Sequence, residues 1–328
     1  MKKIFPTCRV AALLVAASLL SACQGVRSGD SLTASATTGA DRGVTATTTS
    51  SAPANSNPPP TTELPHTAPL PDIEVYPDAA YSFDPYCFDR LIGAYEADAR
   101  LLADAILGYQ PTVELSVAYA QTVVDNIAFE FPPAALADFA VSGGVVTITY
   151  LNDEIEHARQ LIAFQSAVNR ALSILSATDS EARRATLLYD YVVKQVSYFT
   201  TDYTDQEITA FSALTAGETI CYGFADAFGY LLRQTGMEAH LWRGGTYSIS
   251  GFSDHGWCYA KIDGAYYHFD PTWERSKYKS TGVNGYVYFG LSDQKRFTSL
   301  SKTCTSGFGL LEETCDVTKA NQKLAPSP

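Results

Sequence analysis

From about residue 71 onward, the pattern of hydrophobic and polar residues predicts helices and strands in mixed order, and hence an α+β fold. In the first part of this stretch, apolar residues recur at helical spacing in two segments and alternate as in β-strands in two others. The predicted elements are helices over 88–107 and 117–129 and strands over 111–116 and 144–150.

A long helix follows, which Asn152 or Asp153 could cap and which runs towards Ser176. Its apolar face is predicted to carry Ile155, Ala158, Leu161 and Ile162. His157 lies among charged residues of the same helix, so we expect a surface histidine there rather than a functional one.

The rest of the chain alternates helices with strands again. Residues 178–181 have the composition of a helix cap and predict a helix through residue 195, followed by an extended piece at 198–200. Residues 222–234 have helix-forming composition, and residues 238–243 are predicted to form a strand. A last strand over 286–290 is expected to close the sheet.

Residues 255–270 have the pattern of a β-hairpin, because Asp263-Gly264 separates two apolar strands. A two-residue turn pairs Ile262 with Ala265. The same register places Asp270 opposite Trp257, with side chains alternating between the two faces of the sheet.

This register sorts the polar side chains of the hairpin by face. His255 lies on the face of Asp270 and two residues along, a diagonal of roughly 7–8 Å that an imidazole and a carboxylate can span. Cys258 falls on the opposite face, which removes it from a site built on that pair. His268 shares the face of Asp270 and is the rival for a role there, although a hydrogen-bonded core histidine is the more common outcome.

The N-terminus has the composition of a secretory signal peptide, with a basic start and an apolar run over 10–20 that is too short to span a bilayer. Residues 20–23, Leu-Ser-Ala-Cys, resemble the lipobox of bacterial lipoproteins. We therefore expect a signal peptide over 1–22 and lipidation of Cys23, which would hold the protein at the extracytoplasmic face of the cell membrane by its lipid anchor alone. Residues 23–70 are rich in Ser, Thr, Ala and Pro and are predicted to be a disordered linker.

Composition narrows the class of partner. The 328 residues carry a formal net charge of −12, which argues against nucleic-acid binding, while 46% hydrophobic residues allow a buried core. Cys304 and Cys315 bracket a glycine-containing loop and are a candidate disulfide, as suits an exported protein, whereas Cys87 could pair or stay reduced. The cysteines and histidines lack metal-binding spacing, so we expect neither a metal nor a cofactor.

Cys221 has the sequence context of a reactive thiol. Small polar residues lead the chain to Cys221, and the predicted helix begins directly after it. Unpaired N–H groups and the positive end of the dipole at a helix N-terminus stabilise a thiolate and lower the pKa of the thiol. A nucleophilic cysteine, a histidine base and an orienting carboxylate are the parts of an acyl-transfer site, and Cys221, His255 and Asp270 are the candidates.

Three segments of the chain resemble, in order, the motifs of the transglutaminase-like superfamily. They are residues 221–225 (Cys-Tyr-Gly-Phe-Ala), 255–257 (His-Gly-Trp) and 267–273 (Tyr-His-Phe-Asp-Pro-Thr-Trp). The resemblance spans about 185–273 and implies a papain-like α+β core, in which helices pack on an antiparallel sheet. It also implies Cys221 as nucleophile, His255 as general base and acid, and Asp270 fixing the imidazole tautomer. Members of this type usually have Ala and Asn where this chain has Gly256 and Cys258, and Gly256 is expected to loosen the strand.

The resemblance and the candidate residues together predict a surface-anchored cysteine hydrolase that cleaves peptide or isopeptide bonds through an acyl-enzyme. The expected substrates are peptides, proteins or cell-wall peptides. A protein-glutamine acyltransferase using an amine acceptor and a non-catalytic binding module at the cell surface remain as alternatives. Three segments are predicted after the linker: an α+β accessory region over 71–177, a catalytic domain over 178–300, and an extension over 301–328 with the candidate disulfide and a disordered tail.

Overall fold

The computed structural model describes residues 69–199, 203–248, 251–292, 305–306 and 324–327. The predictions for the leader, for Cys23, for the linker up to residue 68 and for Cys304 and Cys315 fall outside these residues. The described residues form an α+β fold, as predicted, and from Leu70 onward they belong to one compact unit. Among them, no helix is both long enough and apolar enough to span a bilayer.

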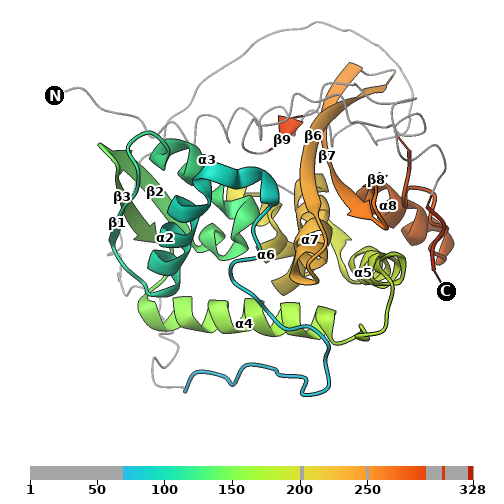
Figure 1. Cartoon of the computed structure of the whole chain (residues 1–328), viewed down its shortest axis with the longest axis horizontal. Helices are drawn as coiled ribbons and strands as arrows, with labels where there is room; N and C mark the ends of the chain where they lie inside the picture. Colours follow the sequence, from blue (N-terminus) through green and yellow to red (C-terminus); the bar gives the residue numbers. More distant parts are fainter. Residues whose placement is uncertain (1–68, 200–202, 249–250, 293–304, 307–323, 328) are drawn as a thin grey trace, which may run out of the picture. The chain divides into compact units, whose positions relative to one another are not determined.

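We call residues 81–150 the N-terminal region. It contains a three-stranded antiparallel sheet of order β1-β3-β2, beside which α2 and α3 lie (Figure 1). Its elements are η1 (Arg90–Tyr95), α2 (Glu96–Leu107), β1 (Thr112–Glu114), α3 (Ala120–Glu130), η2 (Pro132–Leu136), β2 (Ala137–Ser142) and β3 (Val145–Tyr150).

Two details of this region differ from the sequence prediction. The helix predicted over 88–107 is broken at Gly93, whose φ of 44° and ψ of −108° separate η1 from α2. Strand β2 was not predicted, because its apolar positions directly follow a proline-initiated turn of helix. A turn at Gly143 and Gly144, with φ of 58° and 89°, joins β2 to β3.

Helix α4 (Glu154–Leu172) begins where the sequence predicted. The Asp153 side chain caps it by accepting a hydrogen bond from the Glu156 N–H at 2.9 Å. The prediction of its buried face was wrong, since Ile155 is 44% exposed. The apolar side chains that α4 buries are Phe164, Ala167, Val168, Ala171 and Leu172.

His157 is buried rather than on the surface, which corrects the second prediction for this helix. Its Nε2 lies 2.8 Å from the carbonyl oxygen of Ile106, and its ring packs against Tyr109 and Tyr150 of the N-terminal region. Burial lowers the pKa of His157, and the ring acts as a polar contact between α4 and α2.

We call residues 154–292 the core region. Its main sheet has the order β8-β7-β6-β9 with antiparallel neighbours, and α7 lies against β6 and β7 (Figure 1). After α4, its elements are α5 (Glu181–Gln195), β4 (Ser197–Tyr198), η3 (Asp205–Ile208), α6 (Ala210–Thr215), β5 (Glu218–Thr219), α7 (Cys221–Gln234), β6 (Ala239–Ser248), β7 (Gly251–Ile262), β8 (Ala265–Phe269) and α8 (Pro271–Thr281). Strand β9 (Thr305–Ser306) adds to the edge of this sheet beside β6.

The predicted hairpin and its register are confirmed. Ile262 pairs with Ala265, and the turn residues Asp263 and Gly264 have φ of 50° and 82°, as a two-residue turn with two left-handed positions requires. The same register pairs Tyr259 with His268 and Cys258 with Phe269.

The strand predicted over 286–290 is absent from the described core region. Tyr286 and Gly290 have positive φ values of 52° and 59°, which interrupt an extended conformation. The segment still lies beside β8, because Asp270 donates a backbone hydrogen bond to Tyr288 and Leu291 forms an isolated bridge with His268. A helix that was not predicted, α8, begins directly after β8.

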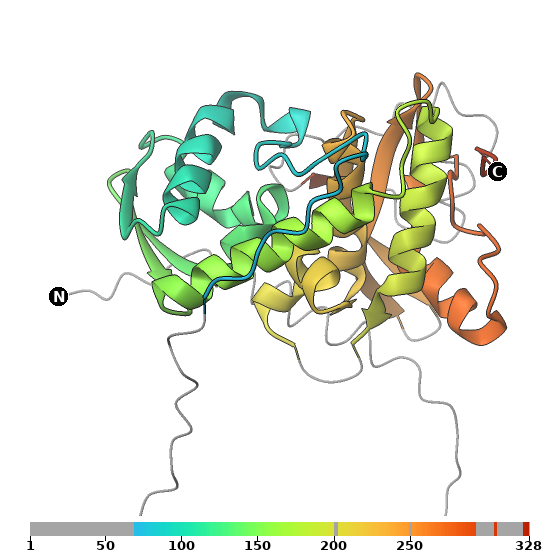
Figure 2. The same cartoon turned by 90° about the horizontal axis from the view of Figure 1, so that it is seen from below.

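The two regions have separate hydrophobic cores that α4 connects. One cluster of buried residues belongs to the N-terminal region and another to α4, α5, α7 and the main sheet. Helix α4 runs along both, in contact with η2 on one side and with α5, α6 and α7 on the other (Figure 2).

Candidate active site

Cys221 is the first residue of α7, where the sequence predicted a helix start. Strand β5 pairs in parallel with β4 and leads the chain through Ile220, which is extended with φ of −106° and ψ of −172°. Cys221 is 3% exposed and lies in a cluster with Ile208, Ile220 and Tyr222. Its thiol is therefore held at the positive end of a 14-residue helix dipole.

Gly223 fixes the depth at which the start of α7 packs. A Cβ atom at this position would lie 1.9 Å from Oγ1 of Thr219 and 2.9 Å from the carbonyl oxygen of Thr209. No side chain fits there without moving the backbone of a neighbour. The glycine two residues after Cys221 thus sets the position of the nucleophile candidate by close packing.

Strand β7 approaches the same helix end through Gly256. A Cβ atom at Gly256 would lie 3.2 Å from the ring and 3.3 Å from the Cα atom of Tyr222. Gly256 pairs with Arg243 within the sheet, and its lack of a side chain allows the strand and the helix to touch. Because Tyr222 follows Cys221 and Gly256 follows His255, the backbones of the two candidate residues each lie one residue from this contact.

His255 and Asp270 form a buried pair. Nε2 of His255 lies 2.7 Å from Oδ2 of Asp270, and the two residues are 6% and 1% exposed. A carboxylate can only accept, so the neutral imidazole carries its proton on Nε2 and its lone pair on Nδ1. The carboxylate is the only hydrogen-bond partner of this side chain among the described residues, which leaves Nδ1 for another group.

The Asp270 carboxylate is fixed by a second role. Its Oδ1 accepts a hydrogen bond from the Trp273 N–H at 3.0 Å and so caps α8. The backbone of Asp270 is also held, because the Tyr189 hydroxyl donates to its carbonyl oxygen at 3.0 Å. A helix N-terminus stabilises a negative charge, so the cap favours the ionised carboxylate that orients the histidine.

Aromatic rings enclose the imidazole. Trp273 stacks on His255 with ring centroids 4.9 Å apart and an angle of 18° between the planes. The ring centroid of Trp257 lies 6.2 Å from that of His255, and Trp257 is fully buried. These rings exclude water from the His255–Asp270 hydrogen bond, which strengthens it.

The rival residues have other surroundings. His268 is fully buried, and its Nδ1 accepts a hydrogen bond from Nε1 of Trp257 at 2.9 Å, as expected for a core histidine. Cys258 is buried on the α7 side of the sheet, near Gly229, and burial raises the pKa of its thiol. Cys87 is a reduced thiol whose pKa burial raises to about 12. Across the described part of the chain, no group of three or more His, Cys, Asp or Glu residues could hold a metal ion.

Sequence reasoning missed two neighbours of Tyr222, the residue that follows Cys221. Arg243 of β6 packs its guanidinium on the rings of Phe129 and Tyr222, with its Cζ 4.7 and 5.6 Å from the ring centroids. An arginine inside a predicted strand is a signal that could have been noticed. Phe129 gave none, because it belongs to α3 in the N-terminal region.

The comparisons with known proteins agree with the sequence motifs. Residues 169–271 match the model of the transglutaminase-like superfamily. No curated protein matches the sequence. The matched segment contains all three candidate residues, Cys221, His255 and Asp270, and most of the core region.

Solved structures give partial similarities. One is described as "a Putative Cysteine Protease from Cytophaga hutchinsonii", with 20% identity over 34% of this chain and 38% of that one and a TM-score of 0.30. Another is described as "a TGase", with 14% identity over 49% of this chain and 48% of that one and a TM-score of 0.29. This chain thus spans less than half the length of either structure, and similarity at this level assigns no activity.

Proposed function

Since residues 169–271 match the transglutaminase-like superfamily, we propose that the protein is a cysteine hydrolase that cleaves peptide or isopeptide bonds. In this proposal Cys221 is the nucleophile, His255 is the general base and acid, and Asp270 orients the imidazole. The family match supports a cysteine hydrolase or transglutaminase-like function in general terms. Within this general function, we propose peptide hydrolysis in particular.

The reaction proceeds in two acyl-transfer steps. Nδ1 of His255 takes the proton of the Cys221 thiol, and the sulfur attacks the carbonyl carbon of the scissile amide. The resulting imidazolium gives this proton to the leaving amine as the C–N bond breaks, which leaves a thioester on Cys221. His255 then deprotonates a water that attacks the thioester and releases a carboxylic acid and the thiol. Asp270 stays ionised and stabilises the imidazolium throughout.

One observation carries the proposal: the buried 2.7 Å hydrogen bond between His255 and Asp270 at the junction that Gly256 and Tyr222 form beside the start of α7. Such a pair presents the lone pair of Nδ1 as a base. A binding module has no need of a histidine held in one tautomer next to a cysteine at a helix N-terminus.

Alkylation of the three thiols in the described residues tests the nucleophile. We expect iodoacetamide near neutral pH to label Cys221 first, because burial raises the pKa of the thiols of Cys87 and Cys258. Peptide mapping by mass spectrometry measures the label at each site, so Cys87, which is half-buried, and Cys258, which is buried, act as internal controls. Labelling of Cys221 no faster than that of Cys87 in the folded protein would contradict the proposal.

The products of the reaction identify the acceptor. Incubation with casein or with cell-wall peptides is expected to give new termini and a thioester on Cys221, both visible by mass spectrometry. The same incubation with an added primary amine separates hydrolysis from transglutamination, because only a transferase would attach the amine to the acyl group. C221A is expected to give neither product.

We further propose that Cys23 is lipidated and that the enzyme acts at the extracytoplasmic face of the membrane. The lipobox-like residues 20–23 and the Ser-, Thr- and Pro-rich stretch after them support this location. C23A is expected to move the protein from the membrane fraction to the soluble fraction. Mass spectrometry of the N-terminal peptide would detect the acyl chains directly.

A further inference from the structure

Arg243 lies beside Tyr222, the residue that follows the candidate nucleophile in the chain. It belongs to β6 and pairs with Gly256 of β7, the residue that touches Tyr222. Its guanidinium stacks over the ring of Tyr222, which follows Cys221 in the chain, and over the ring of Phe129 from the N-terminal region. The guanidinium therefore covers two rings, Tyr222 and Phe129, that pack in the same cluster as Cys221.

This guanidinium has no counter-ion among the described residues. Its Nε and Nη2 are shielded from solvent and donate no hydrogen bond, and in that part of the chain no carboxylate lies within ion-pair distance of it. Asp226 and Glu130 raise the pKa of Arg243 only through electrostatic attraction over a longer distance. Burial lowers the pKa of Arg243, which reflects the unfavourable free energy of a desolvated cation without a partner.

Two other arginines among the described residues have partners for their guanidinium groups. Arg233 is buried as well, but it donates hydrogen bonds to the carbonyl oxygens of Cys87, Phe129 and Ala239. Arg170 forms a two-point ion pair with Glu74. Arg184 also leaves its buried Nε without a partner, but its Nη1 donates to Tyr81 and Asp179, whereas Arg243 leaves both Nε and Nη2 unfilled.

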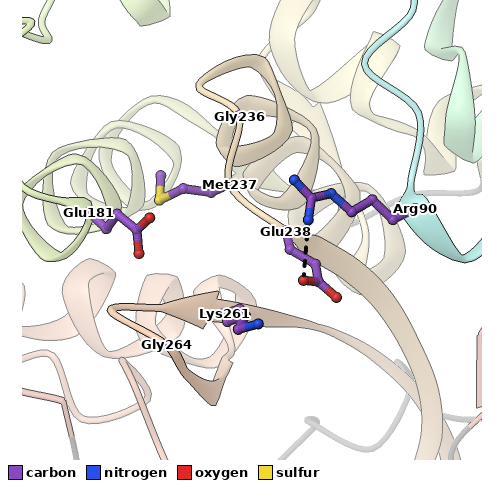
Figure 3. A pocket seen from close by; sticks show the side chains of 7 residues that line it. All are labelled: Arg90, Glu181, Gly236, Met237, Glu238, Lys261 and Gly264. Carbon is purple, nitrogen blue, oxygen red and sulfur yellow. Dashed lines mark ion pairs between the residues drawn. The ribbon is translucent and has the colours of Figure 1, made fainter.

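A pocket elsewhere on the molecule offers no comparable group. This pocket, of about 200 Å³, lies at the C-terminal end of α7, beside Gly236 and Met237, whereas Cys221 is at the other end of this helix (Figure 3). Its Arg90 already pairs with Glu238 at 3.8 Å, and Lys261 lies over the ring of Tyr266. The charges of this pocket are thus matched within the protein.

We infer that Arg243 binds a carboxylate of the peptide substrate, within a few residues of the scissile bond, and so selects acidic substrates. This inference rests on the proposed function, because it assigns a specificity-determining residue to the same site. A guanidinium presents parallel N–H donors that match both oxygens of a carboxylate, and aromatic rings on its faces hold it in one orientation. The carboxylate belongs either to an Asp or Glu side chain or to the C-terminus of the peptide.

Matched peptides test the inference and distinguish the two sources. One mixture carries Glu and the other Gln at the same positions, and each is prepared with a free C-terminal acid and with a C-terminal amide. Binding to C221A is measured by calorimetry, and kcat/KM is measured with the wild-type protein. We expect the carboxylate form to be preferred by about 10- to 100-fold, the range of a charge-assisted hydrogen-bond pair.

Variants of Arg243 connect the preference to this residue. R243Q is expected to remove the preference, and R243K to keep part of it, because lysine retains the charge without the two-point geometry. R100Q is the matched control, since Arg100 is an exposed arginine that pairs with Glu96, and it should keep the full preference. Circular dichroism verifies that each variant folds. If R243Q does not fold, R243K tests the inference in its place.

The outcomes separate this inference from the proposed function. An equal preference in wild-type protein and R243Q, or no preference in the wild type, would overturn the role of Arg243. If C221A binds acidic peptides more tightly while the wild type cleaves none, the carboxylate site stands and the hydrolase proposal fails. If the wild type cleaves peptides at a rate that does not depend on their charge, the hydrolase proposal stands and the role of Arg243 fails.

Discussion

This protein contains two histidine–aspartate pairs in two different regions, and the roles of the two pairs differ. His255 and Asp270 meet at 2.7 Å in the candidate active site. His240 of β6 and Asp89, which directly precedes η1, meet at the same distance where the N-terminal region joins the core region. All four residues are buried.

The difference lies in the second nitrogen of each imidazole. Nδ1 of His240 faces both oxygens of Asp89, and its Nε2 lies 3.4 Å from Glu238. Burial lowers the pKa of His240, but the hydrogen bonds that its ring N–H groups donate to these two acids raise it overall to about 9. His240 is therefore a fixed cation at neutral pH, whereas His255 has one carboxylate partner and a nitrogen left to exchange protons.

The junction around His240 is a structural device. Glu130 accepts a hydrogen bond from the Asp89 N–H at 2.8 Å, and Arg233 reaches across to Cys87 and Phe129. The N-terminal region is thus tied to the core by buried polar contacts, and one of them fixes Phe129 beside Arg243. A buried His–Asp pair is therefore structural when both imidazole nitrogens have a partner, and it can be catalytic when one nitrogen has none.

The largest expected effect is on turnover and comes from replacing the two aspartates in parallel. D270N should reduce kcat/KM by about 10³-fold or more, because an amide can hold the imidazole in the wrong tautomer. The oxygen of the new amide can still cap α8, so the variant should remain folded. D89N should leave the kcat of the folded enzyme within a few-fold of wild type. If both variants lost turnover to a comparable extent, the two pairs could not have the different roles assigned to them.

The same two variants should rank in reverse for stability. D89N leaves the buried His240 with one acid fewer, and we expect it to lower the free energy of unfolding by about 3–5 kcal/mol. Urea denaturation followed by circular dichroism measures this value. D270N should cost less than D89N in the same experiment.

Packing at the start of α7 is expected to come next in size. G223A should lower the free energy of unfolding by about 1–3 kcal/mol and also displace Cys221, because the new Cβ would meet Thr219 and Thr209. G229A is the matched control in the same helix, since its Cβ would lie 3.5 Å from Sγ of Cys258, an ordinary contact. Thermal unfolding and the rate of Cys221 alkylation should both change in G223A only.

The pH dependence of stability should report the ionisation of His240. The pKa of His240 is raised from 6.5 to about 9 in the folded state, so its contribution is complete below pH 6.5 and is lost as the pH rises through 9. We expect a decrease on the order of 3 kcal/mol across this window. Burial raises the pKa of Glu130 from 4.5 to about 8, so its ionisation lowers stability between about pH 4.5 and 8, a window that begins at a lower pH than that of His240. Comparing wild type with H240Q and E130Q separates the two, and an unchanged slope in H240Q would refute the assignment.

The smallest expected effects come from helix caps, which should not depend on the region. D153A and S180A each remove a side chain that accepts a hydrogen bond at the start of α4 or α5. Each should cost about 1 kcal/mol in the free energy of unfolding and leave kcat unchanged. A much larger loss in D153A would mean that the α4 cap also holds the N-terminal region in place.

Much of the core region could be predicted from sequence because its signals are local. The Asp263-Gly264 turn fixed the hairpin register, and with it the face shared by His255 and Asp270. The cap at Ser180 and the helix start at Cys221 were also predicted, since the residues that satisfy the first backbone N–H groups lie within a few positions.

The predictions that failed involve partners that are distant in sequence. The aromatic segment 286–290 has the composition of a strand, but its contacts with β8 are made by a backbone with positive φ at Tyr286. His157 was assigned to the surface, since the tyrosines that cover it belong to another part of the fold. Local propensity says nothing of such contacts.

Local signals in the chain were enough to predict the starts of α4, α5 and α7, the hairpin register and the candidate nucleophile, base and acid. Only the tertiary structure decided which charges find partners: His240 meets Asp89 across 151 positions, and Arg243 meets two aromatic rings but, among the described residues, no acid. The physical reason is range, because backbone hydrogen bonding and side-chain alternation act between near neighbours, whereas burial and electrostatic pairing depend on segments that only folding brings together.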